Sequence, residues 1–194
     1  MKKNQLITVL SVLGISFALG LSTTSVHADS TGTTADSTGT TSVGKFTVNP
    51  GSLSIDSVPD FNFGSTSVKD LTTGTTLNYQ SGSNNKLTVS DYRGASNPDW
   101  TLGASLSDFT STSGNRKVAG SINLATDTKA AGTISKTGGK VWDNVDAETN
   151  GAGDASATVS TDTKLVTEAN SAVDGGNYTS TITWTMTNTA ASAK

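Results

Sequence analysis

The chain has 194 residues, a formal net charge of −3, a hydrophobic fraction of 33% and no cysteine. The lack of cysteine excludes disulfide stapling, so stability must come from an apolar core and hydrogen-bonded backbone. The single histidine, His27, lies in an N-terminal segment that we expect to be removed. The mature chain would then lack the usual ligands of zinc sites and the base of nucleophilic triads.

The first 28 residues have the plan of a secretory signal peptide. Lys2 and Lys3 precede an apolar run from Leu6 to Leu21, and residues 26–28 place small side chains around a cleavage site. A membrane anchor is the alternative, but the run is shorter than the roughly 20 apolar residues that a spanning helix needs. We therefore expect secretion, with no membrane span in the mature chain.

Removal of that segment makes the protein more acidic. It takes away two of the 13 basic residues and none of the 16 acidic ones. The mature chain would carry a net charge of about −5, which gives no electrostatic attraction to phosphate backbones. We expect no nucleic-acid partner.

The mature chain opens with a repeated low-complexity tract. The heptapeptide ADSTGTT occurs twice, over residues 28–34 and 35–41. Small polar residues have nothing to bury, so we expect a flexible leader over residues 29–44. A folded domain over 45–188 and a short C-terminal tail over 189–194 complete the predicted organisation.

Short alternating segments dominate the rest of the chain. Apolar residues alternate with polar ones in pairs, as strands require: Phe46 and Val48, Leu53 and Ile55, Leu87 and Val89, Ile122 and Leu124. Outside the predicted signal peptide, no apolar residues recur at helical spacing. We predict an all-β fold, an antiparallel β-sandwich of immunoglobulin-like or related type. Glycine and asparagine interrupt residues 129–154 repeatedly, which predicts a long irregular loop there.

Two doublets stand out among the strands: Trp100 with Leu102, and Trp184 with Met186. Side chains at i and i+2 of a strand point to the same face, so each doublet places two bulky groups side by side. One interpretation is a core layer, in which each tryptophan buries about 200 Å². The alternative is an aromatic platform that stacks on sugar rings. Clean alternation is what burial of one face produces, and it favours the core.

These segments resemble a known family. In chain order, residues 53–64 (LSIDSVPDFNFG), 87–94 (LTVSDYRG), 100–109 and 178–188 resemble the WxL domain of surface proteins from Gram-positive bacteria. Met186 stands where the family usually has leucine. Methionine fills a similar volume with a more adaptable side chain, so we expect the packing to be kept.

The resemblance implies a non-enzymatic secreted protein that attaches non-covalently to the cell wall, through peptidoglycan. It also implies companion WxL-interacting and other surface proteins. Residues 189–194 contain no LPxTG-like sorting signal, so we expect adhesion by surface contacts, without a cofactor. The alternative is an assembly subunit of a cell-surface complex whose main partner is another wall-associated protein.

Three further residues are candidate ligand contacts. Trp142 lies in the irregular region, where an aromatic could contact a sugar or, alternatively, close one end of the sandwich. Asp91 and Arg93 follow a strand and could form a polar ligand contact. The structural alternative is that Asp91 caps the turn and Arg93 pairs with a carboxylate near the Trp100 strand.

Acidic residues in the same region suggest two weaker hypotheses. Asp143, Asp146 and Glu148 could provide the carboxylates of a glycosidase, although solvated loop carboxylates are the simpler interpretation. Asp146, Glu148 and Asn150 also match the start of a calcium loop, but Ala157 stands where the bidentate glutamate is required. We expect no catalytic residues and no metal site beyond this weak calcium candidate.

Overall fold

The computed structural model describes residues 40–94, 99–149 and 151–188. The chain divides into two compact units, Met1–Lys45 and Phe46–Lys194. In the first unit, residues 40–45 are exposed and form neither helix nor strand. The predicted signal peptide, most of the predicted leader and the predicted C-terminal tail lie outside the described residues.

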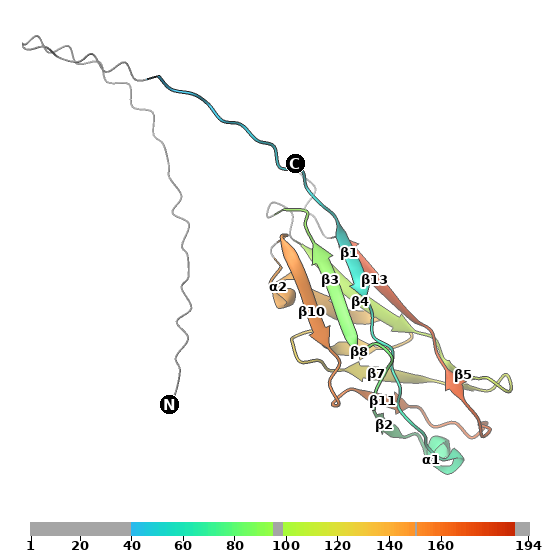
Figure 1. The fold of residues 1–194 in the computed structure, drawn as a ribbon. Coiled ribbons are helices and arrows are strands. Elements are labelled where there is room, and N and C mark those ends of the chain that lie inside the picture. The colour runs from blue at the N-terminus through green and yellow to red at the C-terminus, as the bar shows by residue number, and fades with distance from the viewer. Residues whose placement is uncertain (1–39, 95–98, 150, 189–194) are drawn as a thin grey trace, which may run out of the picture. The chain divides into compact units, whose positions relative to one another are not determined.

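The second unit consists almost entirely of short β-strands (Figure 1). The strands of its described part are β1 (Leu53–Ser57), β2 (Thr76–Asn78), β3 (Lys86–Asp91), β4 (Trp100–Leu106), β5 (Phe109–Ser111), β6 (Lys117–Val118), β7 (Gly120–Leu124), β8 (Gly132–Ile134), β9 (Gly139–Asp143), β10 (Gly153–Thr158), β11 (Lys164–Thr167), β12 (Tyr178–Thr179) and β13 (Ile182–Asn188). Two short helices, α1 (Val68–Thr73) and α2 (Asn144–Ala147), interrupt them.

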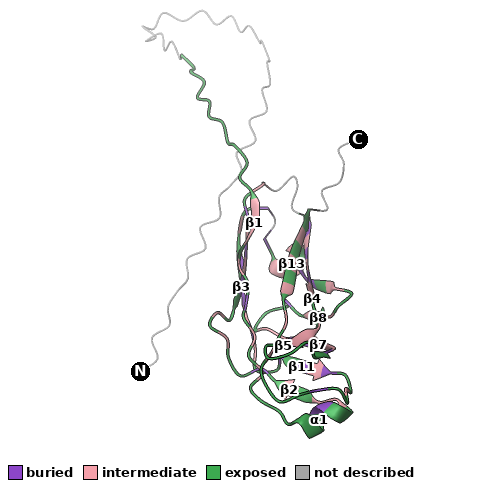
Figure 2. Ribbon diagram, turned by 90° about the vertical axis from the view of Figure 1, so that its right-hand side faces the viewer, coloured by how far each residue is buried: buried purple, intermediate pink, exposed green. Residues whose placement is uncertain are grey.

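Two antiparallel sheets form the layers of a sandwich. One has the strand order β1-β3-β10 and the other β13-β4-β9. Figure 2 shows β1 and β3 on one side and β4 and β13 on the other. The alternate residues Leu87 and Val89 of β3, and Trp100 and Leu102 of β4, are all fully buried in one core. The predicted all-β antiparallel sandwich is confirmed.

A third sheet, of order β2-β11-β7-β8, adjoins the layer of β4. Ser135, just after β8, forms a bridge with Ser105 of β4, and the Ala131 amide donates to the Val141 carbonyl at 3.0 Å. This sheet adds buried residues to the same core: Ile122, Leu124, Ile134 and Leu165. A small sheet has the order β12-β5-β6. Its Val118 forms a second buried cluster with Leu71 of α1 and with Val173.

Residues 129–154 are not a long irregular loop, so that expectation was wrong. They form β8, β9, α2 and the start of β10. The glycines that suggested a loop serve close backbone approach between β8 and β9: a Cβ at Gly132 would overlap the Lys140 carbonyl oxygen, and one at Gly139 would overlap the Thr133 carbonyl oxygen. A glycine in a strand often marks such a close approach of another backbone.

The two sides of the sandwich are closed differently. On one side, α2 and the turn after it connect β9 directly to β10, so the edges of the two sheets are tied together. On the opposite side of the sandwich, the two sheets end in the edge strands β1 and β13, which are not connected in this way. Their inward residues are only half-buried, although they pack on the main core: Leu53, Ile55, Ile182, Trp184 and Met186.

Candidate functional site

The first doublet lies at the centre of the core. Trp100 and Leu102 are 0% exposed. The Trp100 indole Nε1 donates to the Thr149 hydroxyl at 3.2 Å, and its ring meets that of Trp142 edge to face. No sugar can stack on an indole enclosed in this way.

The second doublet faces the same interior from an edge strand. Met186 is paired with Leu102 and Trp184 with Ala104 in the β13–β4 register, so all four side chains share one face. Trp184 and Met186 stay half-buried because, among the described residues, β13 pairs with a strand on only one side. The structural role that we expect for this doublet remains a prediction, and its burial is less complete than that of the first.

The position assumed for Trp142 was wrong. It lies in β9, is 1% exposed and packs against Trp100, with ring centroids 6.0 Å apart. The sequence suggested a loop because the strand alternation is broken there: Val141 and Trp142 are both buried, next to an irregularity in the β4–β9 register. Its indole offers no open face for stacking.

Asp91 and Arg93 form a buried ion pair at the end of β3. The Arg93 Nε donates to Asp91 Oδ1 at 2.9 Å and its Nη2 donates to Oδ2 at 3.0 Å. Asp91 is fully buried, whereas the side chain of Arg93 is 11% exposed. Hydrogen bonds from Arg93 outweigh the effect of burial and hold the pKa of Asp91 below its usual value.

The same guanidinium connects the two layers. Its Nη1 donates to Asn188 Oδ1 at 2.6 Å and its Nη2 donates to the Asp99 carbonyl at 3.4 Å. The backbone amide of Arg93 also donates to Asp91 Oδ1 at 3.3 Å, which is the turn cap that the sequence suggested. Among the described residues, the carboxylate that Arg93 pairs with is Asp91 itself. The arrangement therefore fastens β3 to β13 and orders the turn.

The acidic residues around α2 have local structural partners. Asp143 caps α2 by accepting from the Asp146 amide at 2.9 Å, and it pairs with Lys140. Burial raises the pKa of Asp143, but the bonds from Lys140 and from the Asp146 amide bring it below its usual value. A carboxyl with a lowered pKa is a poor general acid. Asn150, the third residue of the calcium hypothesis, lies outside the described residues.

A shallow hollow brings several of these predicted residues together. Trp142, Asp146 and Glu148 line it, together with Asp127, Thr128, Lys129, Ala147, Asp154, Ala155 and Ser156. Because the Trp142 ring is buried, the hollow presents carboxylates without an aromatic surface. Across the described ranges, no three His, Cys, Asp or Glu side chains are grouped closely enough to hold a metal ion.

The sequence did not reveal a second cavity, a groove of about 380 Å³. It lies between α1, the sheets that contain β11 and β5, and the extended segment 61–66. Aromatic rings of Phe61, Phe63, Phe109 and Tyr178 line it, with apolar side chains of Val68, Leu71, Leu77, Val118 and Leu165. Polar groups come from Asn62, Ser65, Thr66, Thr167, Asp174 and Asn177.

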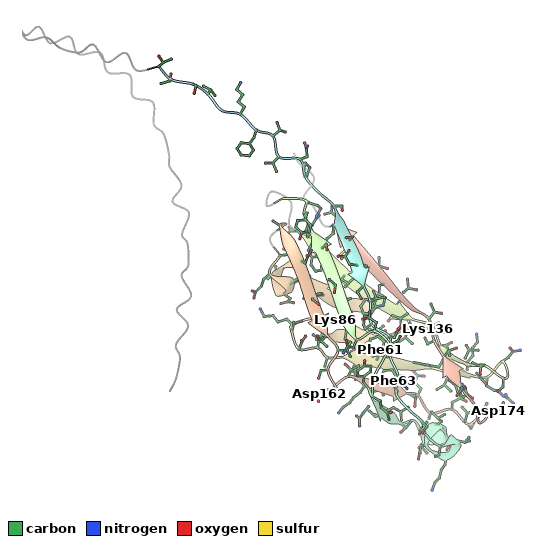
Figure 3. The ribbon with its side chains drawn as sticks, in the orientation of Figure 1. Phe61, Phe63, Lys86, Lys136, Asp162 and Asp174 are labelled. Carbon is green, nitrogen blue, oxygen red and sulfur yellow. The ribbon has the colours of Figure 1, made fainter. Side chains whose placement is uncertain are left out.

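One side of the groove is a preformed aromatic stack. The rings of Phe61 and Phe63 are parallel, with centroids 6.1 Å apart, and both meet the edge of Tyr79 at interplanar angles of 72°. Tyr79 is 6% exposed and belongs to the main core. Buried Tyr79 therefore packs against both half-exposed phenylalanines. Figure 3 labels Phe61 and Phe63, which lie next to one another.

Hydrogen bonds hold the rim of the groove. The Tyr178 hydroxyl donates to the Asp174 carbonyl at 3.0 Å and accepts from the Asp174 amide at 3.1 Å, which closes the loop 174–178. On the opposite side, Ser67 begins α1 with a capping box to Asp70. Such a cap is a local sequence signal, S-x-x-D before an apolar residue. The groove is thus shaped before any ligand arrives.

Fold and groove together define the class of protein, a β-sandwich module with a groove lined by aromatic side chains. The chain belongs to the WxL family, because residues 29–190 match the family described as WxL domain surface cell wall-binding. This membership makes it a cell-surface, cell-wall-binding domain. No curated protein matches the chain in sequence. None of the helices in the described residues is long and apolar enough to span a membrane.

Proposed function

We propose that the protein is secreted and attaches to the cell wall non-covalently, by binding the glycan of peptidoglycan in the groove between Phe63 and Tyr178. The observation that carries this proposal is the combination of an aromatic side with a polar rim in one preformed cavity. The family is a binding family, which supports a role without catalysis.

The chemistry of the groove matches a sugar ring. Pyranose rings present C–H faces that pack on aromatic side chains, while their hydroxyl and acetamido groups need hydrogen-bond partners at the edges. Ligand sites commonly combine an apolar lining with a few polar groups in a volume of roughly 300–1,000 Å³. The groove has both, with Asn177 and Thr66 on its rim.

The charge of the protein favours the glycan over other cell-wall polymers. The full chain has a net charge of −3, and phosphate-rich polymers would be repelled by an acidic domain. The backbone of the glycan strand is largely uncharged, so burial of its faces does not meet this repulsion.

The family match also supports secretion. It begins at residue 29, directly after the cleavage site that the sequence predicts. We propose that the domain works outside the cell, in the mature form that cleavage at this position would produce.

A pull-down on purified sacculi tests the proposal. Ser65 is exposed on the groove, and Ser65→Glu places a charged side chain in it. Asn177→Ala removes a rim amide without deleting a core contact. We expect at least about tenfold weaker binding for Ser65→Glu, which corresponds to about 1.4 kcal/mol or more. Sacculi stripped of phosphate-containing polymers should bind as well as intact ones.

The matched control is Ser156→Glu, the same change at an exposed serine of β10. It should bind like the unmodified protein, and all variants should keep its melting temperature. Equal binding by Ser65→Glu would remove the groove from the proposal. Complete recovery of the unmodified protein in the unbound fraction, with binding restored only by companion surface proteins, would favour the alternative of an assembly subunit.

A further inference from the structure

Within the residues that the structure describes, the outer edge of β13 carries a row of backbone hydrogen-bonding groups that no strand pairs with. The Ser107 amide donates to the Thr181 carbonyl at 3.0 Å, whereas the Leu106 amide turns away from β13 and donates to Ser135 at 3.1 Å. In an antiparallel ladder the direction alternates. The N–H and C=O groups of Ile182, Trp184 and Met186 therefore point outward, and within the described part of the chain β13 pairs with β4 alone.

The edge strand lacks the devices that normally prevent pairing. Natural edge strands are protected by charged side chains, proline, bulges or short length. β13 has seven residues, ITWTMTN, with neither charge nor proline, and its register with β4 is continuous from Ile182 to Asn188. Such an edge is an open template for another strand.

The interior next to this edge is also incompletely covered. Trp184 and Met186 are half-buried, as are Leu53 and Ile55 on the facing edge strand β1. An additional strand on β13 would bring its own side chains over the gap between the two sheets. Side chains at alternate positions, bulky and apolar, would fit there.

The same protein carries a segment with that pattern, and this segment pairs with no strand in the described part of its own chain. Phe46 and Val48 alternate with polar residues just before β1, yet Phe46 is 90% exposed and Val48 is 78% exposed. No strand is assigned to them. Short, strongly alternating segments of this kind pair readily when a sheet edge is available.

We propose that the segment Phe46–Asn49 of one copy adds as a strand to the β13 edge of a second copy. Phe46 and Val48 then cover Trp184 and Met186, and the backbone of the segment satisfies the outward groups of β13. The donor segment and the acceptor edge are different surfaces of the same chain, so the association is heterologous. It can therefore continue from copy to copy. This self-association does not depend on the ligand of the groove.

Light scattering after size exclusion provides the first test. The unmodified protein should show species larger than one chain, increasing with concentration. Phe46→Ser combined with Val48→Ser should weaken association about tenfold or more, since both apolar contacts are lost. Both residues are exposed, so the melting temperature should not change. The matched control is Val145→Ser, an apolar residue that is 71% exposed on α2, which should associate normally.

Disulfide trapping provides the second test, in a chain that has no native cysteine. In an extended strand, the side chain of Thr47 points to the face opposite Phe46 and Val48. In the proposed pairing, that is the face on which Thr185 of the second copy's β13 lies. Mixing Thr47→Cys protein with Thr185→Cys protein under oxidation should give a linked pair of chains, whereas Thr47→Cys with Ser156→Cys should not. A single-chain mass at all concentrations or no linked pair would overturn the proposal. So would a protein carrying both Thr47→Cys and Thr185→Cys that forms its disulfide only within one chain.

Discussion

Trp100 and Trp142 meet edge to face, with ring centroids 6.0 Å apart and ring planes at 88°. Both are almost completely buried, but their indole nitrogens differ. Trp100 Nε1 donates to Thr149, whereas Trp142 Nε1 has no acceptor among the described residues. The two tryptophans therefore allow a buried indole N–H with a hydrogen-bond acceptor to be compared with one that lacks an acceptor in the described residues.

We predict that Trp100→Phe destabilises the fold more than Trp142→Phe. Both changes remove a similar volume, but Trp100→Phe also leaves the buried Thr149 hydroxyl without its donor, at a cost of about 1–3 kcal/mol. Trp142→Phe removes an indole N–H that makes no hydrogen bond to the described residues in the folded state, so no hydrogen bond is lost. Urea unfolding of both variants measures the difference. An equal or larger loss for Trp142→Phe would show that its N–H is satisfied in solution.

The sequence predicted the sandwich because burial of one face leaves a period of two. β3 and β4 show this pattern, and the order of their motifs also indicated the family. β9 was missed for a physical reason. The glycines of β8 and β9 permit close backbone approach, and local sequence does not distinguish this use of glycine from a turn.

The groove could be predicted only in part. Phe61 and Phe63 stand two residues apart, which places both on one side of an extended segment. The capping box of α1 is readable from Ser67 and Asp70. Their partners Phe109 and Tyr178 come from distant strands. Only the packing of the two sheets brings these residues into one cavity, and no single-sequence pattern records that packing.

The Asp91–Arg93 pair should make stability depend on pH. Hydrogen bonds from Arg93 lower the folded-state pKa of Asp91 below the ordinary 3.8. Its contribution is therefore complete above that value and is lost as pH falls through the lower folded-state pKa. Asp91→Asn removes the charge that balances the Arg93 guanidinium and should cost about 3–5 kcal/mol at neutral pH.

The difference between the unmodified protein and Asp91→Asn isolates this pair. Other carboxyls with lowered pKa values, including Asp56, Asp70 and Asp127, are present in both proteins and cancel in the comparison. Denaturant unfolding across the acidic range should show the difference shrinking as pH falls below 3.8. A constant difference at all pH values would contradict the ionised state of Asp91.

Trp184→Ala should be milder than Trp100→Ala. Truncation of a fully buried tryptophan costs about 3–5 kcal/mol, and we expect that loss for Trp100. Trp184 is half-buried on an edge strand, so about 2 kcal/mol is expected from its smaller buried area. Cell-wall binding should fall only as far as folding falls. A Trp184→Ala protein with an unchanged melting temperature but no binding to sacculi would show that the second doublet contacts the ligand.

Gly82 should control the position of the groove segment. A methyl group at Gly82 would overlap the Asp60 carbonyl oxygen, next to the bond in which the Asp60 amide donates to Asn84 at 2.8 Å. Gly82→Ala must displace residues 60–63 and should cost about 1–3 kcal/mol as an overpacked contact. Gly114→Ala, with nothing within 4 Å of the added Cβ, is the matched control and should be neutral. Melting temperature and binding to sacculi measure both effects, and unchanged binding by Gly82→Ala would separate this segment from the site.

Glu148 has a backbone conformation that suits glycine. Its φ is 58° at the C-terminal end of α2, in the left-handed region that non-glycine residues avoid. Its side chain is 80% exposed and lies 3.9 Å from Lys129, a surface contact that contributes little. Glu148→Gly should therefore raise stability by about 0.5–1 kcal/mol. Lys129→Ala should be neutral in the same denaturant titration and serves as the control for the ion pair. Because Glu148 lies outside the groove, the glycine variant should bind sacculi normally; a loss of binding in a more stable protein would return the α2 hollow to consideration as the ligand site.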